Sequence, residues 1–261
     1  MDALAREVAA VEELDLNGDV HAFLLRDPER FAAFERARSL CFFDAHALTS
    51  DGLEALLRAM PSLAHLRLVN NHNPAMMHLR ARSASLESLV LTHFHQLRTW
   101  EIEAPKLELL ELDNCDANSD GELDRRFHVG DGIIYGNFSE RLCAAILDGA
   151  PDAKLPALRE LTLWNNPYAA GPLLAVESMR VDIRCAQGHP TLERLTLANV
   201  THVRSLSLKR VPKLRFVAVS QYDDEGVGTT WLERVDLDGV PEGCAIELCS
   251  ITPSRVGLGG S

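Results

Sequence analysis

Carboxylate and amide side chains alternate along one short segment, residues 113–124, which reads DNCDANSDGELD. A glycine, Gly121, follows the third of the alternating polar residues. A hard cation such as calcium binds about six to eight oxygen atoms, and alternating acidic side chains bring several of them to one point when a glycine lets the chain turn. The segment therefore predicts a calcium site. Its candidate ligands are Asp116, Asn118, Asp120, the backbone carbonyl of Glu122, and Asp124.

These five ligands stand in the order found in the calcium loop of EF-hand proteins, which the segment resembles. The last ligand position departs from that family, because Phe127 stands where the family has a bidentate glutamate. Calcium would bind weakly unless Asp131 or Asp113 supplied the missing oxygens. Asp and Asn also favour surface turns that hold no ion. Both interpretations, a calcium site and an ion-free polar turn, stay open.

A second pattern, with apolar residues at the first, fourth and sixth positions of a hexapeptide, recurs along the whole chain. Successive side chains of a strand point to opposite faces, so each copy predicts a strand with its leucines on one face. In three copies the ninth position holds Asn71, Cys115 or Asn166, where a side chain can bond the turn backbone. The copies are VEELDL (11–16), ARSLCF (37–42), LAHLRL (63–68), LESLVL (86–91), LELLEL (107–112), LRELTL (158–163), LERLTL (192–197), LRFVAV (214–219) and LERVDL (232–237).

The copies resemble the leucine-rich-repeat signature LxxLxLxxN/C over most of the chain. The resemblance implies an α/β solenoid, a horseshoe with a parallel β-sheet on its concave face and helices and extended segments on its convex face. We expect one domain over residues 1–256, with a cap helix at 1–10 and a second cap near residues 243–251. Residues 257–261 are expected to form a disordered tail or linker. An insertion at 116–138 carries the candidate calcium ligands.

The segments between copies predict what backs the concave sheet. Three of them have helix signals: residues 27–38 with Pro28 at the first helical position, residues 49–63 with an apolar stripe, and residues 138–151 with Ser139 as cap and Gly149 as end. Such helix-bearing units resemble ribonuclease-inhibitor-type repeats. By contrast, LRTWEI (97–102) and VRSLSL (203–208) lie only 10 or 11 residues from the neighbouring copies. That step leaves no room for a helix, so an extended backing is expected there.

The third, fifth and seventh positions of each copy point out of the concave sheet. Aromatic side chains at these positions have no core to enter, and acidic residues surround them, which is typical of a protein-binding surface. The alternative is that a loop or the 116–138 insertion folds over these side chains as a flap. The candidate partner-binding residues are Phe43, Arg67, Glu111, Asp113, Glu160, Trp164, Phe216, Arg234 and Asp236.

Composition narrows the class of partner. Asp and Glu number 38 against 26 Lys and Arg, giving a net charge of -12. A negative surface repels phosphate backbones, so we expect a protein partner of basic or mixed charge and no nucleic acid. No run approaches the roughly 18 apolar residues of a membrane-spanning helix, and the N-terminus has no secretory pattern. Six cysteines without a CxxC pair indicate reduced thiols and a cytoplasmic location.

Catalytic motifs are missing from the sequence. It contains no HExxH, GxSxG or GxGxxG, and its closely spaced histidines, His93 and His95, fall in a turn after a predicted strand. We therefore expect a non-enzymatic protein-interaction module with no catalytic residues and no cofactor apart from the possible calcium. Three alternatives remain: a leucine-rich-repeat inhibitor or regulator of a basic enzyme, a binding module that responds to calcium through residues 116–124, and catalysis that uses the histidine-rich stretch around His93 and His95.

Overall fold

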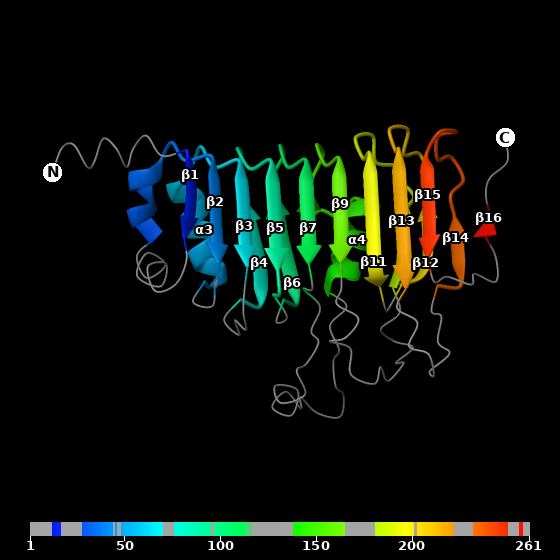
Figure 1. The fold of residues 1–261 in the computed structure, drawn as a ribbon, viewed down its shortest axis with the longest axis horizontal. Coiled ribbons are helices and arrows are strands. Elements are labelled where there is room, and N and C mark those ends of the chain that lie inside the picture. The colour runs from blue at the N-terminus through cyan, green and yellow to red at the C-terminus, as the bar shows by residue number, and fades with distance from the viewer. Residues whose placement is uncertain are drawn as a thin grey trace, which may run out of the picture.

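The computed structural model describes residues 12–16, 28–43, 45, 48–69, 76–94, 97–113, 115, 138–164, 181–200, 203–221, 232–249 and 256–257. Within these ranges the chain consists mostly of parallel β-strands with few helices, in a solenoid-like order (Figure 1). In the same ranges, no helix is long and apolar enough to cross a membrane.

Nine parallel strands form one sheet, here called the front sheet. Their order across the sheet is the same as their order along the chain. Figure 1 shows these strands side by side and pointing the same way. Eight of the nine hexapeptide copies lie in this sheet, as the spacing predicts. The strands are β1 (Glu13–Leu16), β2 (Ser39–Phe43), β3 (His65–Val69), β5 (Ser88–Thr92), β7 (Leu109–Asp113), β9 (Glu160–Trp164), β11 (Arg194–Val200), β13 (Phe216–Gln221) and β15 (Ala245–Cys249).

A second layer, here called the back layer, covers one face of the front sheet (Figure 1). The chain crosses between the layers, so that helices or short strands separate most front strands in sequence. The back layer contains the 3-10 helix η1 (Pro28–Phe34), α3 (Ser50–Ala59), the sheet β4 (His78–Arg82), β6 (Thr99–Glu103) and β8 (Ala153–Lys154), the helix α4 (Phe138–Asp148), and the sheet β10 (Val181–Cys185), β12 (Val203–Leu208), β14 (Arg234–Asp236) and β16 (Val256–Gly257).

The core lies between the two layers and is built from rows of equivalent leucines. Leu66, Leu89 and Leu110 pair in register across β3, β5 and β7, and each is at most 1% exposed. Parallel strands in register place equal positions of each copy side by side, so the leucines of successive copies stack into a continuous apolar row. Removing such rows from water is the dominant favourable contribution to folding.

The helices of the back layer follow the sequence signals with two differences. In α3, the Thr49 hydroxyl oxygen accepts a hydrogen bond from the Gly52 N–H at 3.0 Å, and the predicted apolar stripe is buried. The segment after Pro28 forms a 3-10 helix rather than an α-helix. Residues three apart eclipse one another in a 3-10 helix, which lets Phe31 and Phe34 both pack on the core.

The second difference concerns α4, which begins at Phe138, so that Ser139 falls in its first turn rather than at its cap. Its predicted end is confirmed, because Gly149 follows the helix with a φ of 75°. That left-handed conformation is one that glycine adopts without steric cost. The extended backing expected around LRTWEI and VRSLSL is also confirmed, as strands β6 and β12.

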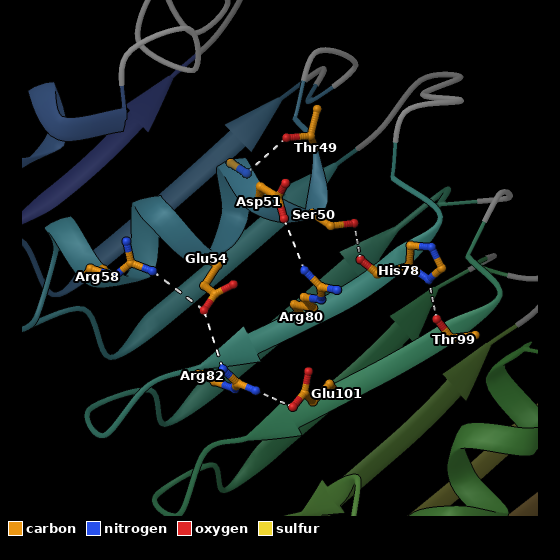
Figure 2. A network of polar contacts seen from close by, with 11 residues as sticks. Thr49, Ser50, Asp51, Glu54, Arg58, His78, Arg80, Arg82, Thr99 and Glu101 are labelled. Carbon is orange, nitrogen blue, oxygen red and sulfur yellow. Dashed lines mark hydrogen bonds and ion pairs between the residues drawn. The ribbon is translucent and has the colours of Figure 1, made fainter.

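Figure 2 shows the polar network where the backing changes from helix α3 to strands β4 and β6. Arg82 of β4 contacts both Glu54 of α3 and Glu101 of β6. A second arginine, Arg80, reaches Asp51 at the start of α3 over 3.2 Å. Exposed ion pairs each contribute about 0–1 kcal/mol, so this network aligns the helix with the first backing strands more than it stabilises them.

Candidate functional site

The outward side chains of the front sheet form three rows that run across the strands, because the pairing of the strands is in register. The first row is Glu13, Ser39, His65, Ser88, Leu109, Glu160, Arg194, Phe216 and Ala245. The second is Asp15, Cys41, Arg67, Val90, Glu111, Thr162, Thr196, Ala218 and Glu247. The third is Phe43, Val69, Thr92, Asp113, Trp164 and Ala198.

Two large aromatic side chains of the third row are open to solvent. Phe43 is 41% exposed and Trp164 is 47% exposed. Between them in the row stand Val69, Thr92 and Asp113. An aromatic side chain on a sheet face that is this far exposed leaves a large apolar area in water. Both rings are therefore accessible to a partner.

A third predicted anchor, Phe216, lies in a different environment. It belongs to the first row and is half-buried. The guanidinium of Arg194 lies 4.7 Å from the centre of its ring, and the same arginine is 4.0 Å from the carboxylate of Glu160. The sequence correctly predicted that Phe216 faces outward. In the structure, however, the Arg194 side chain of the neighbouring strand β11 already lies over its ring.

The three rows carry more negative than positive charge. Their carboxylates are Glu13, Asp15, Glu111, Asp113, Glu160 and Glu247, and their guanidiniums are Arg67 and Arg194. Burial raises the pKa of the Cys41 thiol, the negative charge of Asp15 raises this pKa further, and the positive charge of Arg67 lowers it. A face of this kind attracts cationic groups.

Asp113 and Thr92 each have a buried side-chain oxygen on this face, which is unusual for an outward position. The Asp113 Oδ1 atom and the Thr92 Oγ1 atom are both buried, and neither has a hydrogen-bond partner in the part of the chain that the structure describes. Burial raises the pKa of the Asp113 carboxyl, His93 lowers it, Glu111 raises it and Arg67 lowers it. Leaving a buried polar atom without a partner costs about 1–3 kcal/mol, so such pairs of atoms are uncommon in folded proteins.

Thr92 is not among the predicted partner-binding residues, although its position in the repeat is a signal for it. Thr92 occupies the same seventh position of its copy as Phe43, Asp113 and Trp164, which were selected. Threonine attracts less notice than an aromatic or a charged residue at that position.

The placement of Arg234 and Asp236 on the concave face is wrong. Both lie on β14, which belongs to the four-stranded sheet of the back layer. The ninth front strand is instead β15, formed by Ala245–Cys249, which the sequence was expected to use as a cap. Arg234 forms an ion pair with Asp236 at 3.2 Å on the back sheet. Neither residue contributes to the three outward rows.

A second acid on this back sheet, Asp182 of β10, is held by two neighbours of β12. It accepts a hydrogen bond from Arg204 Nε at 2.9 Å and one from the Ser205 hydroxyl at 2.6 Å. The hydrogen bond from Arg204 is the main reason that the pKa of the Asp182 carboxyl falls to about 2. Burial opposes this effect in part, and Arg184 supports it.

The substitution Asp182→Asn is expected to lower the free energy of unfolding by about 1 kcal/mol at pH 7. The full pKa shift would correspond to about twice that amount, but solvent screens a pair whose arginine is partly exposed. A depressed pKa contributes stability above the unfolded-state pKa, and that contribution is lost as pH falls toward about 2. Urea unfolding at pH 7 and near pH 2.5 should show the difference from wild type shrinking.

As a control for Asp182→Asn, Asp236→Asn removes a carboxylate from the same sheet, where the arginine partner Arg234 is more exposed. We expect a smaller loss at pH 7. An Asp182→Asn variant whose deficit stayed constant from pH 7 to pH 2.5 would contradict the assignment.

The candidate calcium ligands at 116–124 lie outside the described residues, as do most of the 116–138 insertion and the expected cap helix at 1–10. The calcium site, the ion-free turn and the flap therefore stay predictions. Among described residues, no group of three or more His, Cys, Asp or Glu side chains is arranged to hold a metal. Immediately before the insertion, the buried Cys115 thiol at the ninth position donates to the Leu91 carbonyl of the neighbouring strand β5 at 3.3 Å, whereas a bond to the backbone of the turn was expected. The expected tail begins within β16, which includes Gly257.

Comparison with protein-family models found no matching family, and comparisons with curated proteins and with solved structures found no match either.

Proposed function

We propose that this chain is a leucine-rich-repeat solenoid that binds a protein partner through the outward face of its front sheet, without catalysing a reaction. The observation that supports this most is the exposure of Phe43 and Trp164 in one row of that face. Parallel sheets are normally covered on both faces, and within the described part of the chain the back layer covers one face of the front sheet. A partner would cover the other face.

The partner has a basic or mixed-charge surface. Six carboxylates against two guanidiniums in the three rows give a field that attracts cations and repels acidic proteins. Aromatic anchors then supply most of the binding energy, because a few buried aromatic contacts dominate typical interfaces. Charge selects the partner and speeds its arrival, while Phe43 and Trp164 hold it.

The test is a comparative capture from cell extract with three versions of the protein. The first is wild type, and the second carries Phe43→Glu with Trp164→Glu. The third is a control with Glu103→Lys and Lys154→Glu, a charge exchange between two exposed, paired positions of the back layer. Wild type and control should retain a common set of proteins that the Phe43/Trp164 variant loses. Recovery of the same set by all three versions would show that the face assignment is wrong.

A second candidate function is inhibition of a basic enzyme by covering its active site. The excess of carboxylates in the outward rows favours it, because charge complementarity steers such an enzyme toward the face. The affinity of such an inhibitor would then fall steeply between about 50 and 500 mM salt, since the Debye length shortens over that range. A scaffold held mainly by Phe43 and Trp164 would show an affinity that changes little with salt.

A further inference from the structure

The turn that joins β12 to β13, residues 209–215, carries a cluster of positive charge. Its cationic side chains are Lys209, Arg210, Lys213 and Arg215, and all four are exposed. The turn lies at the edge of the molecule where the front strands begin, beside the equivalent turns at 187–193 and 238–244 (Figure 1). The chain as a whole has a net charge of -12. The turn therefore contrasts in charge with both the whole chain and the acidic outward rows.

Arg210 has a backbone conformation that glycine adopts in the neighbouring turns. Its φ is 54°, and the equivalent residues of the two adjacent turns are Gly188 with a φ of 89° and Gly239 with a φ of 84°. A Cβ atom has a steric cost in this left-handed region, whereas glycine has none. The sequence therefore keeps an arginine where glycine would give the same turn at lower cost. Residues held in such conformations cluster at functional sites.

The preceding turn accommodates this arginine through its own glycine. A Cβ atom at Gly188 would lie 2.8 Å from both the Cβ atom and the carbonyl oxygen of Arg210, so glycine is required there. The His189 N–H donates to that carbonyl oxygen at 3.2 Å, and the Lys209 N–H donates to the Cys185 carbonyl oxygen at 3.3 Å. These contacts fix the backbone of Lys209 and Arg210 in advance. A site arranged in this way loses less conformational entropy when it binds a ligand.

The acids of the two adjacent turns leave the region positive. Glu193 of the preceding turn is already paired with Arg159 at 2.8 Å. Asp238 and Glu242 of the following turn add two negative charges against the four positive charges. A positive region attracts carboxylates and phosphates. A long polyanion such as nucleic acid would also meet the acidic outward face, which repels it, so a short anionic segment fits better.

We propose that the turn at 209–215 is a second binding site, which takes a short acidic segment of a protein. The Arg210 guanidinium is its central group and donates hydrogen bonds to a carboxylate of that segment. The other three cations of the turn surround it with positive charge. Phe43 and Trp164 stand at the opposite ends of the front strands, so this site does not rest on the function proposed above.

Fluorescence anisotropy of labelled N-acetyl-pentaglutamate amide, titrated with the full chain, tests the site. We expect saturable binding with a high-micromolar dissociation constant at about 50 mM salt, and severalfold weaker binding at about 300 mM salt because ions screen the charges. Pentaglutamine, which has the same length without the charge, should not bind. A single-stranded hexanucleotide, which carries five phosphates, should bind more weakly than pentaglutamate.

Two lysine variants form a matched pair. Lys213 follows Pro212 on this turn, and Lys106 follows Pro105 in the same way on the turn before β7. Both lysines are exposed, so each substitution by alanine removes one surface charge from the same kind of turn. Lys213→Ala should weaken pentaglutamate binding by about threefold, whereas Lys106→Ala should leave it unchanged.

Arg210→Gly separates binding from folding. Glycine relieves the left-handed conformation, so the midpoint of urea unfolding should not fall. Pentaglutamate should nevertheless bind at least about fivefold more weakly, because the charged hydrogen bonds are lost. Arg210→Lys keeps the charge without the planar fork and should lose less affinity than Arg210→Gly.

The site would be overturned by equal affinity of wild type and Arg210→Gly, by absence of saturable binding to wild type, or by equal losses for Lys213→Ala and Lys106→Ala. A lower unfolding midpoint for Arg210→Gly would show that the arginine serves the fold instead of a ligand. Tighter binding of the hexanucleotide would overturn the assignment to an acidic protein segment. None of these results decides the capture experiment, which changes Phe43 and Trp164 alone.

Discussion

Leu110→Ala is expected to lower the free energy of unfolding by about 3 kcal/mol, whereas Leu109→Ala should lower it by less than about 1 kcal/mol. The two leucines are consecutive on β7 and chemically identical. Leu110 faces the core and is 0% exposed, so its truncation loses apolar burial and leaves a cavity. Leu109 stands in the first outward row and is only half-buried, so solvent fills the space that its truncation opens.

Urea unfolding followed by far-ultraviolet circular dichroism measures both losses. Because each strand of such an array contacts mainly its neighbours, local unfolding near β7 can precede the main transition. Hydrogen exchange at the amides of β5, β7 and β9 therefore complements the urea curves. Equal losses for Leu109→Ala and Leu110→Ala would mean that the two faces of β7 are not distinguished by burial, and the outward rows would lose their basis.

The leucine spacing predicts the front sheet well because strand alternation and stacking both derive from it. A hexapeptide with apolar residues at its first, fourth and sixth positions buries the fourth and sixth on one face, as Leu66 and Leu68 do in β3. Parallel stacking then requires the same register from copy to copy, and the pairs Leu66 with Leu89 and Leu89 with Leu110 satisfy it. Local pattern and neighbouring contacts agree, so the prediction is confirmed.

The spacing wrongly places LERVDL (232–237) in the front sheet, because the strands of the back layer also bury alternate apolar residues. Val235 on β14 is buried like the leucines of the front strands, since both layers face one core. The distance along the chain separates the two cases. From Leu214 to Leu232 the step is 18 residues, whereas the shortest step between front strands is 21 residues, from Leu86 to Leu107. An 18-residue step is too short to cross to the back layer and return.

The candidate site was predictable only in part. The alternation of side chains along a strand predicts which face a residue lies on, but it does not predict which neighbouring side chains cover that residue. Phe43, Trp164 and Phe216 all face outward as expected. Whether an outward ring is covered depends on the side chains of the neighbouring strand. The Arg194 guanidinium of β11, for example, lies over the Phe216 ring. The burial of Thr92 likewise exceeds that of other outward residues on β5, and no sequence pattern encodes it.

Because the Phe216 ring is already covered by Arg194 and the Trp164 ring is exposed, we expect the two side chains to contribute unequally to partner binding. With a partner recovered by capture, Trp164→Ala should weaken binding by about 30- to 100-fold, which is about 2–3 kcal/mol and typical of an exposed aromatic that becomes buried at an interface. Phe216→Ala should weaken it by less than about fivefold. Its ring already contacts the Arg194 guanidinium at 4.7 Å, so a partner gains less by covering it. Calorimetric titration of each variant measures both changes.

Trp164→Phe separates the roles of ring area and indole. Phenylalanine keeps most of the apolar surface, so a purely hydrophobic contact would lose less than about fivefold in affinity. A larger loss would indicate a cation stacked on the indole, because tryptophan is the best aromatic partner for a guanidinium. The neighbouring Asp113 makes that outcome the expected one. If Phe216→Ala weakened binding as much as Trp164→Ala, Arg194 would have to leave the Phe216 ring on binding, and the anchor would lie in the first row rather than the third.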